Sequence, residues 1–509
     1  MILSKGECFM GGTKEDAENP RRRWEPQGRG FKQKLCWWSL RNLFRASITL
    51  TLLCTLGARP DMAQTDKPGT LTLDQAVQFA LQHSPDLQTA TAEIQKQEGN
   101  AKSAKSPLLP QVDLLADASR YRVDHGILPG ADPRNLHFDN MIYTTGAELH
   151  FLVWDFGKTS TQLQATRQRL SSSKLFLDRR GEEVIYNVAS LFLKAETYDD
   201  LMEAAQARKK SLEVLLDQTQ QLLKGGRAVP LDLLKVQTRL AQVESDIATL
   251  QAGRQGTTSA LLAAMGWEGE VPTLIKGEAA RIPEAPSKPA DVLLREALAR
   301  RPDLAAESEE SQAANLLVKS ARRSLLPRFD FRAAAYDYGA NSPVAFGAII
   351  GEILPQLNVP APSVSHWQGD WVIGGRVTFP LFDGGRRRGE IIAAEAQQHQ
   401  AESAVLRTRL AITREVRTSL ANLASDQERI KALEASVTQA QEALRLERLK
   451  YEGGRSEINF VLDAEAALLT NDSLLREARR AAQIDHLSLD LSLGAIAENS
   501  LSAPTSPAP

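Results

Sequence analysis

The run Gly157-Lys158-Thr159-Ser160 contains the residue types of a phosphate-binding loop. A Gly-Lys-Thr/Ser run that follows a strand and opens a helix is typical of a P-loop, whose backbone N–H groups surround nucleotide phosphates. A P-loop also needs a glycine five residues before Gly157, and Leu152 occupies that position. The run therefore predicts a junction between a strand and a helix, without nucleotide binding.

Other combinations that support catalysis or metal binding are missing from the sequence. The seven histidines are scattered, and none stands four residues from another as zinc ligands on a helix do. No Gly-x-Ser-x-Gly or His-Glu-x-x-His motif occurs. The three cysteines, Cys8, Cys36 and Cys54, all precede residue 60. We therefore expect no enzyme activity, no cofactor and no metal site.

The basic run at residues 384–389, Gly-Gly-Arg-Arg-Arg-Gly, could suggest binding of phosphate or RNA. A nucleic-acid-binding protein usually shows a basic footprint, whereas this chain of 509 residues has a formal net charge of -2. We therefore expect no nucleic-acid partner. The simpler interpretation is a helix start at a membrane edge, where the arginines meet lipid headgroups or lipopolysaccharide.

The first 64 residues resemble a secretory signal peptide with an N-terminal extension. A basic stretch up to Arg45 precedes an apolar run at residues 46–56, and small residues follow. That run is too short to span a membrane, and no other apolar run approaches the required ~18 residues. The chain is therefore expected to be exported without a transmembrane helix.

Beyond the signal, the chain consists of two similar halves. Residues 71–266 resemble residues 291–496, a linker at 267–290 separates them, and 497–509 form an Ala-, Ser- and Pro-rich tail that we expect to be disordered. For example, Met265-Gly266 matches Leu493-Gly494. A repeat of this length is a duplicated half of a domain and not a solenoid unit.

Each half contains two segments in which apolar and polar residues alternate, at about 112–119 and 143–153 and again at 329–335 and 371–379. Period two predicts strands with one apolar face, and the aromatic residues near their ends favour membrane β-barrel strands. A β-sandwich with one wet face is the alternative. Because four strands cannot close a barrel, a barrel requires several copies of the chain.

A long segment without proline follows the strands in each half, at about 158–224 and 386–451, with apolar residues at heptad spacing. Sustained heptads predict coiled-coil helices of ~100 Å. Both segments end at a glycine pair, Gly225-Gly226 and Gly453-Gly454, and a second helix starts soon afterwards. Each half is thus expected to contain a long antiparallel helical hairpin.

The arrangement resembles the TolC-like outer-membrane efflux proteins, over residues from about 71 to 496. The features that carry the resemblance are the duplication, the Ser-Pro-Asp-Leu helix start at 84–87, Leu-Leu-Pro before each first strand, Leu-Phe-Asp-Gly-Gly at 381–385, and Tyr-Glu-Gly-Gly at 451–454. The resemblance implies a mainly α fold with a membrane β-barrel portion. In it, three protomers each contribute four strands to one barrel, and their hairpins form an α-helical barrel.

The resemblance also implies partners and a location. The protein would be a homotrimer in the lipid of the cell outer membrane, with its helices in the periplasm. A periplasmic adaptor (membrane fusion protein) and an inner-membrane pump would dock at the helical tips, and small molecules would leave through the channel. Two alternatives remain, namely the outer-membrane component of a type I protein secretion system and a soluble periplasmic coiled-coil scaffold.

The same resemblance implies residues of a periplasmic entrance gate. Asp463 falls on one of the family's entrance aspartates, and Tyr451 falls on a tyrosine of the constricting network. Phe460 stands where a second aspartate often lies, and Ser456 stands where an arginine can lie. Asp232 is the counterpart of Phe460 in the first half. We hypothesise that Phe460 narrows the entrance by dewetting; the alternative is that it packs between helices.

The turns at the ends of the two hairpins are the predicted docking surface for the adaptor. The residues assigned to this surface are Gly225, Gly226, Arg227, Val229, Pro230, Gly453, Gly454, Arg455 and Glu457.

Overall fold

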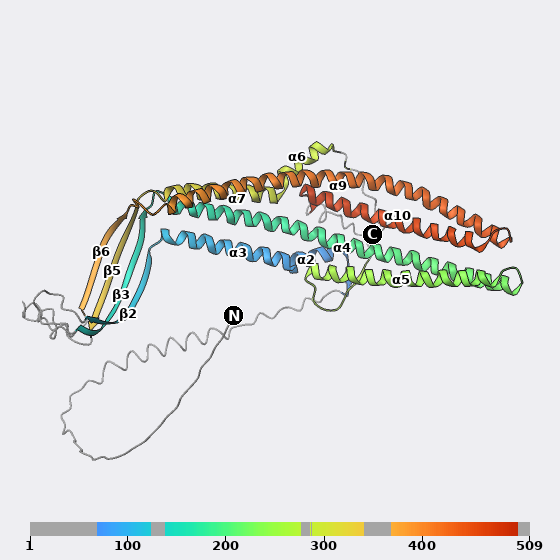
Figure 1. Ribbon diagram of the computed structural model, residues 1–509, viewed down its shortest axis with the longest axis horizontal. Coiled ribbons are helices and arrows are strands. Elements are labelled where there is room, and N and C mark those ends of the chain that lie inside the picture. The colour runs from blue at the N-terminus through green and yellow to red at the C-terminus, as the bar shows by residue number, and fades with distance from the viewer. Residues whose placement is uncertain (1–68, 124–137, 276–285, 287, 341–367, 497–509) are drawn as a thin grey trace, which may run out of the picture. The chain divides into compact units, whose positions relative to one another are not determined.

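The computed structural model describes residues 69–123, 138–275, 286, 288–340 and 368–496, all within one compact unit, Pro68–Pro509. The predicted signal segment and the C-terminal tail lie outside these residues. So do residues 124–137 and 341–367, which make up most of the two strand-to-strand loops. Within the described residues, the predicted mainly helical, duplicated fold with four long strands is confirmed (Figure 1).

Both halves contain the same main elements in the same order. The first half contains β1 (Thr70–Leu71), α2 (Leu73–His83), α3 (Pro85–Lys105), a 3-10 turn η1 (Ser106–Leu108), β2 (Gln111–Val123), β3 (Phe138–Trp154), α4 (Lys158–Lys224) and α5 (Pro230–Met265). The second half contains β4 (Thr273–Leu274), α6 (Ala290–Arg300), α7 (Pro302–Arg323), β5 (Arg328–Ala340), β6 (Gln368–Thr378), α9 (Arg386–Glu452) and α10 (Ile458–Leu493).

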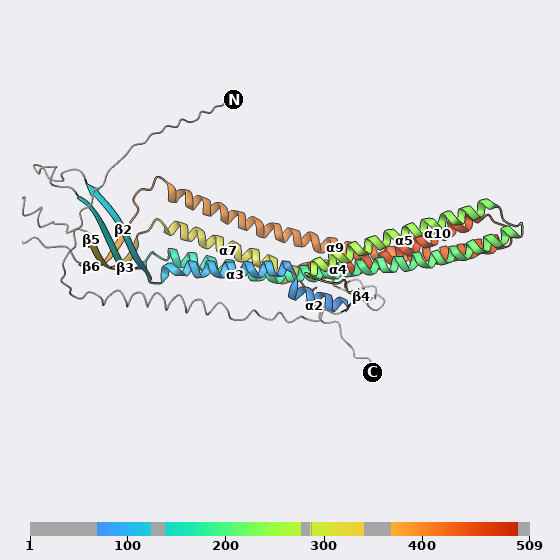
Figure 2. The same cartoon turned by 90° about the horizontal axis from the view of Figure 1, so that it is seen from below.

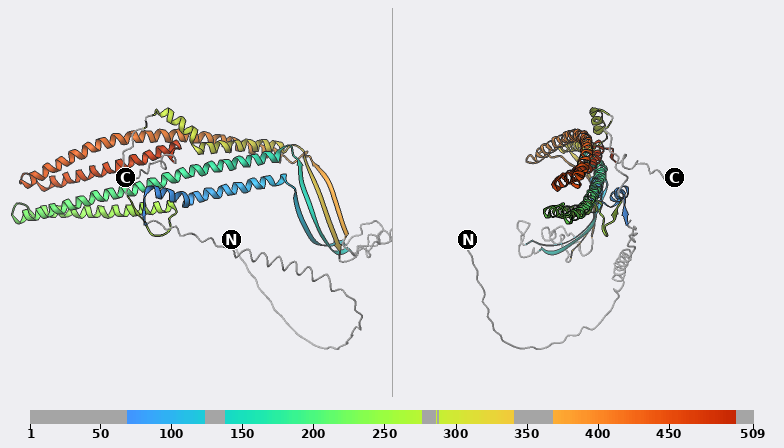
Figure 3. Two further views of the ribbon diagram at one scale, coloured as in Figure 1. Left: turned by 180° about the vertical axis from the view of Figure 1, so that it is seen from behind. Right: turned by 90° about the vertical axis from the view of Figure 1, so that its right-hand side faces the viewer.

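The helices match in length because the same signals start and stop them. α4 and α9 both have 67 residues, and α5 and α10 both have 36. A glycine in the left-handed region precedes each long helix, with φ of 79° at Gly157 and 89° at Gly385. Proline opens α3 and α7, where a missing N–H is harmless. Both hairpins consequently end at the same side of the unit (Figure 3).

Four antiparallel strands form one sheet in the order β2-β3-β5-β6, so strands from the two halves meet at the β3–β5 pair. The cross-strand register brings the apolar residues of all four strands to one face. These are Val112, Leu114, Ala116, Ala118, Tyr143, Ala147, Leu149, Phe151, Phe329, Phe331, Ala333, Ala335, Trp371, Ile373 and Val377, and the cross-strand pair Thr145 and Asp337 lies among them. The predicted alternation is therefore present in the sheet, and β2 and β6 are its edges.

The long helix α4 holds the two halves together. It packs against α3 and α5 of its own half and against α7 and α10 of the other, whereas α9 packs against α6, α7 and α10 (Figure 2). Near the tips, Leu212 of α4 and Val461 of α10 are both fully buried in one cluster with Val236 of α5. The heptad stripe predicted for α9 is largely buried, as Ile412, Val416, Leu423, Ile430, Val437 and Leu444 show.

Short elements lie beside the middle of the long helices and include residues of the predicted linker. β1 pairs in parallel with β4, and α2 packs on α4 and α5. The buried residues Leu71, Phe192 and Met265 share one cluster. Position 266, at the end of α5, requires glycine. Its φ is 70°, and an added Cβ would lie 2.5 Å from the His83 carbonyl oxygen.

Candidate functional site

The face of the sheet opposite the apolar one is polar. It carries Gln111, Asp113, Asp117, Thr144, Glu148, His150, Asp330, Arg332, Tyr336, Asp370, Arg376 and Thr378. A sheet with one largely apolar face and one charged face can separate lipid from water, as barrel strands in outer membranes do. No helix within the described residues is long and apolar enough to cross a membrane.

Aromatic side chains mark both ends of the apolar face. Tyr143 and Trp371 lie towards the strand-to-strand loops. At the other end, the ring centroids of Trp154 and Phe156 are 6.0 Å apart, and those of Phe156 and Phe329 are 6.4 Å apart. Two aromatic belts that flank an apolar band are typical of a membrane β-barrel, where the rings lie at the headgroup level.

The Gly157-Lys158-Thr159-Ser160 run forms the junction of β3 and α4, as predicted. The Asp155 carboxylate accepts hydrogen bonds from the backbone N–H groups of Gly157, at 3.1 Å, and Thr159, at 2.8 Å. These are the donors that a phosphate would need at this helix start. The chain's own carboxylate therefore occupies them. Asp383 bonds the N–H groups of Gly385 and Arg387 in the same way at the start of α9.

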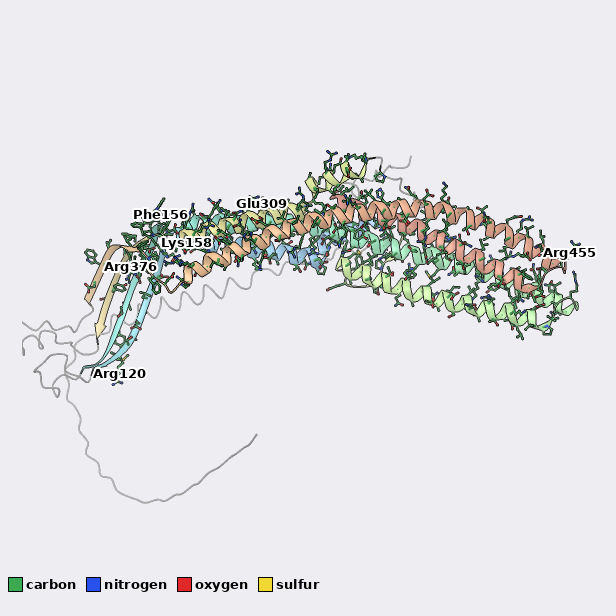
Figure 4. The ribbon with its side chains drawn as sticks, turned by 45° about the horizontal axis from the view of Figure 1, so that its top comes forward. Arg120, Phe156, Lys158, Glu309, Arg376 and Arg455 are labelled. Atoms are coloured by element: carbon green, nitrogen blue, oxygen red, sulfur yellow. The ribbon has the colours of Figure 1, made fainter. Side chains whose placement is uncertain are left out.

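The two hairpin tips adopt nearly the same turn. Gly226 and Gly454 are left-handed, with φ of 67° and 69°. The next N–H, of Arg227 or Arg455, donates to a carbonyl five residues back at 2.8 Å, which is the Schellman end of a helix. Gly225 and Gly453 cap the long helices with ordinary negative φ. Figure 4 shows Arg455 at one tip.

The remaining tip residues begin the returning helices. Val229 and Glu457 are the N-cap residues of α5 and α10, and Pro230 is the first residue of α5. The Asp232 carboxylate accepts from the Val229 N–H at 3.3 Å, so this gate candidate has a capping role in the structure. The Arg227 guanidinium reaches the Glu452 carbonyl oxygen of the other tip at 3.5 Å.

The other gate candidates fall into two groups. Phe460 and Asp463 are exposed on α10, where Phe460 has 57% of its surface exposed and Asp463 lies 3.8 Å from Arg239 of α5. Phe460 is thus not packed between helices of its own chain. Tyr451 lies in the cluster between the hairpins, and burial raises the pKa of its hydroxyl. Ser456 donates to Glu447 at 2.9 Å.

A polar network close to the tips joins both hairpins, and no local sequence pattern predicts it. Arg448 of α9 contacts Glu465 of α10 at 2.6 Å and the Ser211 hydroxyl of α4 at 2.5 Å. Glu465 is almost fully buried, and Arg208 of α4 also carries charge near it. Arg448 and Glu465 are on different helices, so no sequence spacing links them.

A second buried network lies further along the same helices. Arg480 of α10 contacts Glu196 of α4 at 2.6 Å and Asp200 at 3.0 Å. Groups of three or more residues able to hold a metal ion are not found within the described ranges. The Arg480 network therefore links α10 to α4 through ion pairs.

Comparison with known proteins agrees with this geometry. A model of the family described as outer membrane efflux protein matches residues 76–267 and 293–495. The pyoverdine export outer membrane protein OpmQ of Pseudomonas putida is 25% identical over 81% of this chain and 83% of its own length. The outer membrane protein TolC of Escherichia coli K12 is 24% identical over 85% of this chain and 84% of its length.

A solved structure shares the fold. The CmeC outer membrane channel of Campylobacter jejuni superposes with a TM-score of 0.70 at 16% identity, over 83% of this chain and 86% of that one. The family match covers both halves and leaves out the residues between them, and the TolC-like resemblance is confirmed. The chain therefore belongs to the outer membrane efflux protein family and is an outer-membrane efflux channel.

Proposed function

We propose that three copies of this chain form the exit duct of a tripartite efflux system. In this system, a periplasmic adaptor and an inner-membrane pump deliver small molecules to the helical tips. The observation that carries the proposal is the four-stranded sheet with an apolar face and two unpaired edges among the described residues, β2 and β6. Open edges bind other strands, and closure into a barrel with neighbouring copies removes them.

The outer side of α9 supports the same assembly. Ile392, Leu406 and Leu410 are all exposed, and their spacings of 14 and 4 residues place them on one stripe of the helix. An apolar stripe on the outermost helix needs a cover in water, and the next copy in a trimer provides one. In this proposal, the chain is divided into a signal peptide with an N-terminal extension (1–64), two repeats (71–266 and 291–496) and the linker between them (267–290).

The entrance gate and the docking surface belong to the same proposal. Exposed Phe460 and Asp463 would approach their copies around a three-fold axis and narrow the channel there. The two tips, with Arg227 and Arg455 at their surface, would meet the adaptor. The turn geometry shared by the tips and the exposure of these side chains support both the gate and the docking surface.

Native mass spectrometry of the detergent-purified protein tests the assembly, and conductance in planar bilayers tests the channel. We expect the mass of three mature chains and stable ion-conducting pores. Leu406→Asp should break the trimer, because it buries a charge at the interface between copies. Gln397→Asp is the matched control, since it is nine residues away and faces the opposite side of α9. A monomeric, non-conducting wild-type protein would refute the proposal.

A further inference from the structure

Two adjoining cavities lie where the polar face of the sheet meets the helices. One, of about 350 Å³, is lined by Lys158, Arg323, Arg328 and Arg387 among others. The other, of about 530 Å³, is lined by Arg332 and Arg376 and shares Arg328, Pro107, Leu152 and Thr378 with the first. Six cationic side chains therefore line these two adjoining cavities, which we call together the hollow.

The acidic side chains of this hollow are already committed. Asp155 caps α4, as described above. Glu148 is paired with Arg332 and, at 3.0 Å, with His150. Asp330 lies 2.7 Å from Arg328. Each carboxylate is thus neutralised or saturated by a neighbour.

Three cations of the hollow remain without a carboxylate partner among the described residues, and we call Lys158, Arg323 and Arg376 the cationic collar. The Arg323 guanidinium is held by neutral oxygens, the Gly157 carbonyl at 2.9 Å and the Thr161 hydroxyl. Figure 4 shows the labelled Lys158 and Arg376 near the points where strands and helices join. The collar consequently keeps an excess of positive charge.

Arg376 of the collar lies on the polar face of the sheet. Arg376 is paired in register with Asp330, on the same face as Glu148 and Arg332 and opposite the apolar face. If lipid covers the apolar face, the hollow opens into the passage. We propose that the collar binds anionic groups, such as phosphate, sulfonate or carboxylate, of molecules that pass through the channel. This inference rests on the proposed function and names a substrate class for it.

Block of the current by inorganic triphosphate tests the collar. The anion is added to both compartments of a phosphatidylcholine bilayer, which contains no anionic lipid to occupy the hollow. Wild-type current should fall as the triphosphate concentration rises. The double variant Lys158→Gln/Arg376→Gln should need about a tenfold higher concentration for half-maximal block, because two charge-assisted contacts are lost. Arg323 is left in place because it also holds the start of α4.

The matched control is Lys105→Gln/Arg388→Gln, which removes two exposed cations near the junction that line neither cavity. Triphosphate should block the current through this control variant at the same concentration as in the wild type. Equal block in wild type and collar variant, or equal loss in the control, overturns the proposal. If the protein conducts no current, the proposed function fails instead. Calorimetric titration with triphosphate then tests the collar, because the dissociation constant of the collar variant should be about tenfold higher than that of the wild type.

Discussion

Arg480 of α10 lies 2.6 Å from Glu196 of α4, and the Glu196 side chain is only 3% exposed. The pair links the first half of the chain to the second, with Asp200 as a further partner at 3.0 Å. Buried Glu196 and partly buried Asp200 of α4 thus share one cation from the other half. Removing one member of such a group leaves an uncompensated charge inside the protein.

Arg480→Ala should therefore destabilise the protein by about 3–5 kcal/mol. The neighbouring Arg479→Ala is the control, because Arg479 is exposed and pairs with Glu434 at the surface, where the cost is about 0–1 kcal/mol. Thermal unfolding followed by circular dichroism compares the two. Equal melting temperatures would show that the buried network does not stabilise the packing of α4 and α10.

Phe460→Ala should increase single-channel conductance in planar bilayers, because a ring of exposed phenylalanines at the entrance excludes water from a narrow pore. Leu231→Ala removes an equally exposed apolar side chain from the start of α5 and should leave conductance unchanged. Unchanged conductance in Phe460→Ala would reject the hydrophobic gate.

Arg448→Ala should increase the frequency of channel opening, because it leaves the buried Glu465 carboxylate without its 2.6 Å partner at the junction of the hairpins. Arg445 lies one turn earlier on α9, pairs with exposed Glu442 among the described residues, and serves as the control. Openings counted in single-channel records decide the matter. An opening frequency in Arg448→Ala equal to that of the Arg445→Ala control would show that the network does not affect channel opening.

Gly226→Ala should destabilise the first hairpin by about 1 kcal/mol, because its φ of 67° is strained for any residue with a Cβ. Gly225→Ala should cost less, since Gly225 has a φ of -82° and an added Cβ would meet only carbonyl oxygens at 3.6 Å. The rate of proteolysis at the tip measures the difference. A reversed order would contradict the assigned turn.

Asp426→Asn should stabilise the protein at pH 7. Burial, and then its hydrogen bond with Asp485, raise the pKa of Asp426 to about 6, from an ordinary 3.8. The folded state therefore holds a proton that the unfolded chain releases, and stability falls as pH rises from about 4 to 6. The gain above pH 6 should be about 1 kcal/mol. A melting-temperature profile of Asp426→Asn as steep as the wild type's between pH 4 and 6 would disprove this assignment.

Local sequence signals specify the elements and their order. Proline at the starts of α3 and α7, paired glycines at the tips, and the change from period two to heptads are local signals, because they act through the backbone of neighbouring residues. Together with the repeat, they indicate the family from the sequence alone. They also predicted that Gly157-Lys158-Thr159-Ser160 is a junction.

Which helices share charged partners depends on the three-dimensional packing. Arg480 and Glu196 are far apart in the chain, as are Arg376 and Lys158, so no spacing pattern connects them. The packing also separates the gate candidates, giving Asp232 a capping role and leaving Phe460 exposed. Long-range contacts depend on how the two halves pack around α4. That packing brings together side chains that local signals leave independent.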